Sequence, residues 1–435
     1  MTPLIATSAA PTLDTGATAW MLMSATLVLM MTVPALALFY GGMTRSRGVL
    51  NMMMMSFGVI AVVGVIYPLW GWSMSYGDSL GGILGNPFDG FALDGQVVDA
   101  DGAHIIDDLG VPAYVGVAFQ STFAIITTAL VSGAIAERVK YASWLVFAAL
   151  WVTLSYFPMA HMVWGGGILS GDGWFGSIAE PIDFAGGTVV HINAGIAGLV
   201  LALVIGRRKG FGKVPMRPHN LPLVMIGAAL LWVGWFGFNA GSAFTADGTA
   251  GLAWVNTTSA TAAAILGWLV VERLRDGHMT SLGAASGTVA GLVAITPAAG
   301  ALNPVTSIVL GAVAGVLCAL AVSLKYRWRF DDSLDVVGVH LVGGLVGTIV
   351  VGLLADEGGL FMGDGADQLI VQALIAVVAV VYSGLVTLVI ALVLKATMGW
   401  RVSDDDEASG IDTAQHAESA YEGIGSGRLL TGSEK

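Results

Sequence analysis

The stretch Val190-His-Ile-Asn-Ala-Gly-Ile-Ala-Gly198 returns later in the chain as Val339-His-Leu-Val-Gly-Gly-Leu-Val-Gly347. In both copies a histidine, His191 or His340, is followed by glycines four and seven residues further on. Residues at these spacings lie on one face of an α-helix. The pattern therefore predicts two related helices, each with an imidazole beside a face without side chains that another helix can approach closely.

Both copies lie in apolar segments long enough to cross a bilayer, and the composition of the whole chain agrees with this. Of the 435 residues, 56% are hydrophobic and only 11% are charged, against about 25% charged in an ordinary soluble domain. The mean hydropathy is +0.80, and eleven segments of ~20 residues read as helical spans. We expect these spans at about 17–39, 50–75, 112–136, 142–163, 186–206, 220–241, 250–271, 279–300, 304–325, 334–355 and 368–396.

This composition excludes several classes of protein and leaves an all-α integral membrane protein. A net charge of −12 and a pI of about 4.8 exclude a nucleic-acid partner. A single cysteine, Cys318, excludes a disulfide-stabilised module. The long apolar runs exclude disorder, and they lack the period-two alternation of a transmembrane β-barrel. We expect neither enzymatic activity nor a resident metal or cofactor.

The basic residues predict the orientation in the membrane. When the connections are assigned alternately to its two sides, all 18 Lys and Arg residues fall on one side. The positive-inside rule makes that side cytoplasmic, with the N-terminus outside and the C-terminus inside. The opposite loops are rich in Asp and Glu. Three explanations of these acidic loops stay open: ordinary loop solvation, a surface that stays hydrated in high salt, or local enrichment of cations at the mouth of a pore.

The histidines in the fifth and tenth of eleven transmembrane helices predict an inverted 5+5 repeat plus one extra helix. Because five is odd, two such halves enter the membrane from opposite sides, and transport sites then lie near the midplane between them. By residue count His191 and His340 both fall in the middle part of the bilayer, where ionisable groups usually mark a pathway. One alternative is a buried neutral pair that only satisfies backbone carbonyls. Another is haem ligation, for which His161 is the only further intramembrane candidate.

Longer motifs around these histidines resemble the ammonium transporter (Amt/Mep) branch of the Amt/Rh superfamily. The signature is the run Asp183-Phe-Ala-Gly-Gly-Thr-Val-Val-His191-Ile-Asn-Ala-Gly. Further matches, in chain order, are Phe119–Phe123 with Gly133–Arg138, Ala160-His-Met-Val-Trp164-Gly-Gly-Gly, Gly234-Trp-Phe-Gly-Phe238-Asn-Ala-Gly-Ser242, Thr296-Pro-Ala-Ala-Gly300 and Asp335-Val-Val-Gly-Val-His340. The resemblance covers nearly all of residues 15–422. Two stretches depart from it, since 170–181 looks longer than in bacterial members and 76–111 is long and rich in Asp.

The resemblance implies a homotrimer with one pore through each subunit, in which His191 and His340 are the paired pore histidines. The residues that it assigns to substrate binding are Trp164, Ser242, Phe119, Phe123, Phe238 and Thr296. Of these, two stacked phenylalanines, Phe123 and Phe238, form the outer gate, and Trp164 and Ser242 line the external ammonium site. Asp183 is the buried structural acid beneath that site.

The chemistry of ammonium explains why these residue types suit it. Dehydrating an ion costs on the order of 20 kcal/mol on an idealised Born estimate, but ammonium, unlike K⁺, can release a proton and cross as neutral ammonia. The face of Trp164 attracts a partly stripped cation, and the Ser242 hydroxyl accepts an N–H hydrogen bond that K⁺ cannot make. We expect Asp183 to cap the fifth helix, so that its charge stabilises a nearby cation without touching it, and direct coordination of ammonium by Asp183 is the alternative. Two imidazoles that share a hydrogen bond disfavour a second positive charge, and a neutral pair can relay a proton.

The composition changes after Lys395, which divides the chain into a transmembrane domain, 1–400, and a polar cytoplasmic tail, 401–435. The tail resembles that of the family, which packs under the trimer where a PII-type signalling protein can dock. We therefore predict a multi-pass transporter that moves ammonium or ammonia across the cell membrane. An ammonium sensor and a neutral gas channel of the Rh branch remain alternatives, and electrogenic against neutral net transport stays open.

Overall fold

The structure of the chain, a computed structural model, describes residues 11–421. Within this range eleven helical spans are long and apolar enough to cross a membrane, as the sequence predicts. They run over Thr15–Met43, Val49–Tyr76, Ala113–Ile135, Tyr141–Trp164, Gly187–Ile205, Leu221–Ala243, Gly248–Asp276, Ser281–Ala298, Pro304–Trp328, Val337–Leu354 and Asp367–Thr397. Each end lies within a few residues of its predicted position, so the all-α fold with eleven spans is confirmed.

Most spans contain more than one element, because short π-helical or 3₁₀ turns interrupt the α-helix. The first five spans comprise α1 (Thr15–Met30), η1 (Met31–Leu36), α2 (Ala37–Met43), α3 (Val49–Ile66), η2 (Tyr67–Gly71), α4 (Trp72–Tyr76), α5 (Ala113–Val131), η4 (Ser132–Ile135), α6 (Tyr141–Trp151), η5 (Val152–Tyr156), α7 (Phe157–Trp164), η7 (Gly187–Ile192) and α8 (Asn193–Ile205). The last six comprise α9 (Leu221–Asn239), η8 (Ala240–Ala243), α10 (Gly248–Asp276), α11 (Ser281–Ile295), η9 (Thr296–Ala298), α12 (Pro304–Ala321), α13 (Leu324–Trp328), η10 (Val337–Leu341), α14 (Val342–Leu354) and α15 (Asp367–Thr397).

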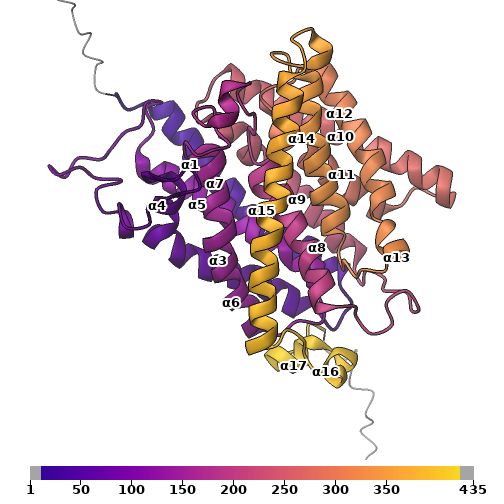
Figure 1. The fold of residues 1–435 in the computed structure, drawn as a ribbon. Helices are drawn as coiled ribbons and strands as arrows, with labels where there is room; N and C mark the ends of the chain where they lie inside the picture. The colour runs from indigo at the N-terminus through magenta and orange to yellow at the C-terminus, as the bar shows by residue number, and fades with distance from the viewer. Residues whose placement is uncertain (1–10, 422–435) are drawn as a thin grey trace, which may run out of the picture.

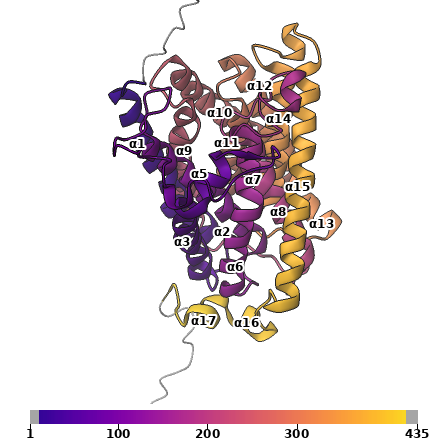
Figure 2. The same ribbon diagram turned by 60° about the vertical axis from the view of Figure 1, so that its left-hand side comes forward.

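The spans form a single bundle (Figures 1 and 2). Helix α1 packs against α5 and α9, α10 packs against α11 and α12, and α15 packs against α8 and α14. Both views show α15 along the full height of the bundle, with two short helices of the C-terminal tail below its lower end. We call the end of the bundle that carries the tail the tail end, and the opposite end the far end.

The two histidine copies occupy equivalent elements. His191 lies in η7 and His340 in η10, and both elements are π-helical and contact each other. The equivalence begins eight residues before each histidine, where the carboxylates of Asp183 and Asp332 accept hydrogen bonds from the first backbone N–H groups of η7 and η10. The capping acid Asp332 is part of the repeat that the sequence analysis missed, although the equal spacing signals it.

The far-end connections contain a few short elements. They are β1 (Ser79–Leu80) and β2 (Leu84–Gly85), which pair antiparallel, with η3 (Phe91–Leu93), η6 (Trp174–Ser177) and η11 (Leu360–Met362). Two aspartates of the long first far-end loop stabilise turns: Asp99 accepts from the backbone N–H groups of 101 and 103, and Asp107 from those of 109 and 111. These two acids therefore have a local structural role.

The tail folds against the tail end as α16 (Asp404–Ser409) and α17 (Ile411–His416). The carboxylate of Asp412 accepts hydrogen bonds from the N–H groups of Leu50 (3.1 Å) and Asn51 (2.8 Å), at the start of α3. Glu407 pairs with Arg401 and accepts from the N–H of residue 209, at 2.6 Å. The acidic tail also pairs with a basic loop, through Lys209 and Asp404 (3.1 Å). The tail residues Arg428 and Lys435 lie outside the described residues.

Candidate functional site

A cavity of about 430 Å³ opens at the far end of the bundle. Its lining includes Trp164 and Ser242, which are predicted for the external site, with Phe123 of the predicted gate and Asp183, the predicted structural acid. The Trp164 indole N–H donates to the backbone carbonyl of Asp183 (2.9 Å), which fixes the ring at the cavity wall. The Ser242 hydroxyl donates to the carbonyl of Phe238 (2.8 Å), so its oxygen lone pairs remain able to accept a hydrogen bond.

Two phenylalanine rings lie at the floor of this far-end cavity. The rings of Phe123 and Phe238 are stacked, with centroids 4.1 Å apart and planes at 23°, and both side chains are buried. Phe119 contacts Phe123 from behind, with centroids 4.8 Å apart, and is fully buried. Trp164 meets Phe123 edge-on at 6.1 Å. The predicted stacked pair therefore exists, while Phe119 supports the pair from outside the cavity.

Beyond the stacked rings lies a narrow apolar space that contains the two histidines; we call it the lumen. Its volume is about 10 Å³, close to that of a single water position. The Nδ1 atoms of His191 and His340 are 3.3 Å apart, and the rings are nearly parallel with centroids at 5.4 Å. The apolar residues that line the lumen with them are Met31, Leu36, Phe39, Ile126, Leu130, Val190, Leu231, Phe238 and Val289, joined by Tyr40 and Trp235.

One nitrogen of the histidine pair has no partner. Within residues 11–421, His191 Nε2 is buried and makes no hydrogen bond, although its ring stacks on Phe238 with centroids 6.2 Å apart. The Nδ1–Nδ1 distance is shorter than two metal–nitrogen bonds of about 2 Å each in line, which disfavours an iron atom between the rings. His161, the further haem candidate, bonds instead to the Ser75 carbonyl (3.2 Å) and the Ser79 hydroxyl (2.9 Å).

Asp183 adopts the capping position predicted for it. Its carboxylate accepts from the backbone N–H groups of residues 186 to 189 and from the Thr188 hydroxyl. Burial raises the pKa of Asp183 above its ordinary range, and these hydrogen bonds oppose that rise. Burial likewise raises the pKa of Asp332, the equivalent acid of the tenth span, to about 6.

Thr296 takes a different place from the one that the resemblance assigns to it. Its hydroxyl accepts a hydrogen bond from the Trp235 indole N–H (2.9 Å) and donates to the Leu292 carbonyl (2.8 Å). Trp235 stacks in turn on His191, with centroids 5.6 Å apart. Thr296 therefore contacts neither the far-end cavity nor the lumen, and it reaches the histidines through Trp235, which the sequence analysis did not single out.

A second open cavity, of about 390 Å³, lies at the tail end. Its ionisable lining residues are Arg208, Lys213, Lys325, Tyr326 and Asp335. The Lys325 ammonium group bonds to the Asp335 carboxylate (2.6 Å) and to the carbonyl of Asp332 (2.9 Å). The rings of Phe211 and Tyr326 stack across this cavity, with centroids 5.5 Å apart and planes at 8°.

A family model described as "Ammonium Transporter Family" matches residues 19–421. The chain belongs to the ammonium transporter family. It is 54% identical over 442 residues to an ammonium transporter of Mycobacterium tuberculosis (strain ATCC 25618 / H37Rv), covering 96% of this chain and 92% of the relative. An ammonium transporter of Aquifex aeolicus is 48% identical, with 94% of each chain covered.

Solved structures agree with this assignment. The crystal structure of Candida albicans Mep2 superposes with a TM-score of 0.80 at 33% identity, covering 91% of this chain and 88% of that one. A structure named "Sensor Amt Protein" superposes with a TM-score of 0.83 at 27% identity, covering 92% and 98%. The transporter moves ammonium across a membrane and is not an enzyme.

The tail end of the transporter is held together by a buried ion-pair group that the sequence analysis did not predict. Glu137 accepts from Arg45 Nε and Arg208 Nη1, both at 2.9 Å, and Arg208 forms a bidentate pair with Asp331. Burial raises the pKa of Glu137, but Arg208 and Arg45 outweigh it and bring that pKa below its ordinary range. The group joins four connections that are far apart in the chain.

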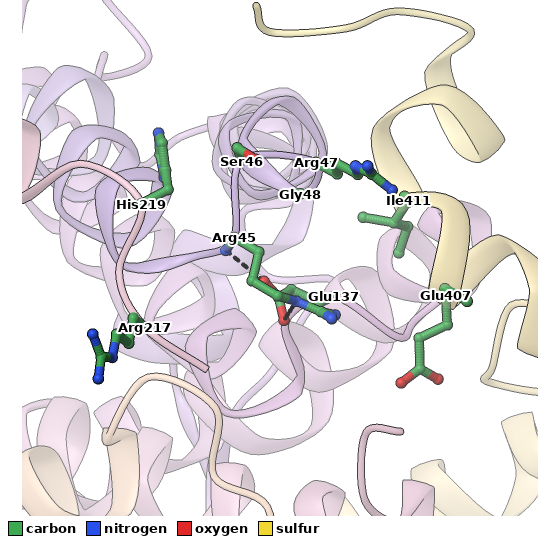
Figure 3. Close-up of a pocket in the computed structure, with 11 residues that line it drawn as sticks. Arg45, Ser46, Arg47, Gly48, Glu137, Arg217, His219, Glu407 and Ile411 are labelled. Atoms are coloured by element: carbon green, nitrogen blue, oxygen red, sulfur yellow. Dashed lines mark hydrogen bonds and ion pairs between the residues drawn. The ribbon is translucent and has the colours of Figure 1, made fainter. Parts of the chain in front are cut away.

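This ion-pair group borders an opening of about 380 Å³ between the loops and the tail. Figure 3 shows the Arg45 side chain folded over Glu137, with Glu407 and Ile411 of the tail on the opposite side. Arg217 points away from Arg45 in the same view. The basic side chains here consequently diverge, and the contacts of this region serve chiefly to fix the tail and the loops to each other.

Proposed function

We propose that this transporter recruits ammonium as a cation at the far end, removes its proton, and passes ammonia along the histidine pair. The observation that carries the proposal is the order of the groups: the far-end cavity with Trp164 and Ser242, the stacked Phe123 and Phe238, and then the lumen with the two histidines. A polar cavity, a dry barrier and buried polar groups are the three parts that selective passage of ammonium requires.

Recruitment depends on groups that favour a partly dehydrated cation. The Trp164 face contributes about 1–2 kcal/mol when water is excluded, and the Ser242 oxygen accepts an N–H bond that K⁺ cannot donate. The Asp183 carboxylate lies in the cavity wall with its oxygens held by backbone N–H groups, so it acts through its charge rather than by direct ligation. Transfer of the proton to the histidine pair, whose His191 ring stacks on Phe238, leaves neutral ammonia to pass the phenylalanine rings, and the proton leaves from the pair towards the tail end.

The histidine pair suits the neutral substrate and its proton. A single hydrogen bond between the two Nδ1 atoms requires one ring to donate and the other to accept, so the pair carries at most one positive charge. The unpartnered Nε2 of His191 is the group that can exchange a proton or a hydrogen bond with the substrate. We therefore propose His191 as the first acceptor and His340 as the second member of the relay.

The remaining features of the proposal concern the whole molecule. We propose that the tail end faces the cytoplasm, because every Lys and Arg of the chain falls on that side of the alternating topology. We further propose residence in the cell membrane, assembly as a homotrimer, and a division into a transmembrane domain, 1–400, and a regulatory tail, 401–435. A PII-type signalling protein is the partner proposed for the cytoplasmic face.

The test is to replace each pore histidine and measure ammonium and K⁺ flux in reconstituted vesicles. We expect His191→Ala and His340→Ala to lose ammonium-over-K⁺ discrimination while the protein still assembles. The matched control is His161→Gln, because His161 is a buried histidine outside the lumen and glutamine can replace its hydrogen bonds. Unchanged discrimination in both pore variants would contradict the relay. Ammonium binding without flux in the unaltered protein would favour the sensor alternative.

A further inference from the structure

The two cavities that lead to the lumen are lined by side chains of opposite charge. The ionisable groups of the far-end cavity are two carboxylates, Glu180 and Asp183, and the hydroxyl of Tyr76. The tail-end cavity has three cationic side chains and a single carboxylate, that of Asp335. A cation therefore meets a negative lining at one mouth and a mainly positive lining at the other.

The loops around each cavity extend this difference. The tail-end segments 207–217 and 325–335 together contain eight Lys or Arg residues and three Asp residues. The far-end segments 165–183 and 242–247 contain four Asp or Glu residues and no Lys or Arg. Eight cationic side chains against three aspartates leave these two segments with a positive surplus. Arg208 and Lys325 of the cavity lining are neutralised by Asp331 and Asp335, so Lys213 is the cavity cation that contributes most to this surplus.

Both cavities share helical elements or ring contacts with the lumen. At the far end, Phe123 and Phe238 separate the cavity from the histidines. At the tail end, α2, α11 and the segment around η10 each contribute to both spaces: Tyr40, Val289 and His340 line the lumen, whereas Met43, Leu282 and Leu334 line the tail-end cavity. The two charged mouths thus lie at opposite ends of the elements that line the lumen.

We propose that this charge difference gives the transporter a directional affinity, with a lower KM for ammonium entering at the far end than for ammonium entering at the tail end. The inference rests on the proposed recruitment of ammonium as a cation. A cavity lined by one sign of charge concentrates the opposite ion and repels the like one, by factors of roughly 10 or more. Lys213 is the residue assigned to this role, because it is exposed in the tail-end cavity and can change without breaking a buried ion pair.

Microscopic reversibility limits how the charge difference between the two cavities can affect KM and Vmax. With no membrane potential and no pH gradient, Vmax divided by KM must be equal in the two directions. A higher KM at the tail end is then accompanied by a proportionally higher Vmax from that side. The charge difference sets how strongly each mouth collects ammonium, while the gradient still sets the direction of net movement.

The experiment measures methylammonium transport from each side in vesicles with both gradients clamped at zero. Protease accessibility of the tail identifies the orientation of the protein. We expect the tail-end KM to exceed the far-end KM by roughly 3- to 10-fold near 0.01 M salt, where the Debye length is about 30 Å. The ratio should approach one near 1 M salt, where that length is about 3 Å.

Two charge reversals supply the matched comparison. Lys213→Glu should lower the tail-end KM several-fold and leave the far-end KM unchanged. Arg273→Glu makes the same change of charge at the same end, but on exposed α10 outside the cavity, and should leave both values unchanged. Equal KM values at low salt, or equal shifts in both variants, would overturn the inference even where selective transport persists. Failure of the proposed function is recognised separately, by pore-histidine variants that keep their discrimination.

Discussion

The hydroxyl of Thr296 acts on the histidine pair through one intermediate, Trp235. It accepts the indole N–H at 2.9 Å, and the indole ring stacks on His191 and contacts Phe238 at 5.4 Å. The rotation of this tryptophan ring is therefore coupled to Phe238 of the stacked pair and to His191. Thr296 is thus a positioning residue, because it acts through Trp235 and not on the substrate.

Thr296→Val should relax ammonium-over-K⁺ discrimination several-fold, because the isosteric valine cannot accept the Trp235 N–H. A buried donor left without a partner costs about 1–3 kcal/mol, which favours other positions of the ring. Thr296→Ser retains the hydroxyl and should behave like the unaltered protein. The measurement is paired ammonium and K⁺ flux, together with the pH profile of transport, in both variants. Discrimination and pH profile unchanged in the valine variant would show that Trp235 holds its position by packing alone.

The sequence predicts the histidine pair well, since regular spacing within one helix is readable from residue order. Asp332 was equally readable, because its distance from His340 repeats that of Asp183 from His191. The Thr296–Trp235 contact, in contrast, cannot be predicted from the order of residues along the chain. It joins residues on two helices, α9 and η9, that meet only in the folded bundle, so no local pattern indicates it.

At the scale of elements, a side chain of the tail helix α17 caps the N-terminal end of α3. The N-cap residue of α3 is Gly48, which has no side chain to accept the free N–H groups of the first turn. Asp412 of the tail supplies that acceptor to Leu50 and Asn51, although it lies 362 residues after Leu50 in the chain. The tail helices have only six residues each and no apolar periodicity, so the sequence predicts a solvated segment there. They form because buried Ile411 and the capped helix hold them in place.

Asp412→Ala should loosen the tail from the bundle, because the start of α3 then loses its cap at a cost of about 1 kcal/mol. We expect faster proteolytic cleavage after Arg401 and a lower Tm, both measured in detergent. Thr413→Ala is the control, since residue 413 is exposed and its hydroxyl contacts only the tail itself. Equal cleavage rates in the two variants would mean that other contacts, such as Glu407 with Arg401, hold the tail without the cap.

At the scale of the whole molecule, the pore and the tail are built from separate sets of contacts. The lumen is lined by residues between Met31 and His340, and none of them belongs to the tail. The tail instead contacts the connections at the tail end, through Lys209 and the start of α3. The first two tail residues also contact the bundle, since Arg401 forms a backbone bridge with Val139 and the N–H of Val402 donates to the Arg138 carbonyl.

Deletion of residues 404–435 should therefore leave a bundle that inserts and still discriminates ammonium from K⁺. The rate of transport should fall, because the loop after α8, which borders the tail-end cavity, loses Glu407 as a partner, and the start of α3 loses Asp412. Both segments then become freer to move. The measurement is initial ammonium flux per reconstituted protein, with K⁺ flux and Tm determined on the same preparation. A truncated protein as fast as the full chain would make the tail a passive segment. A truncated protein that admits K⁺ would instead show that the contacts of the tail act through the loops on the histidine pair. Arg208 offers a route for this, because it pairs with Asp331, shortly before the tenth span.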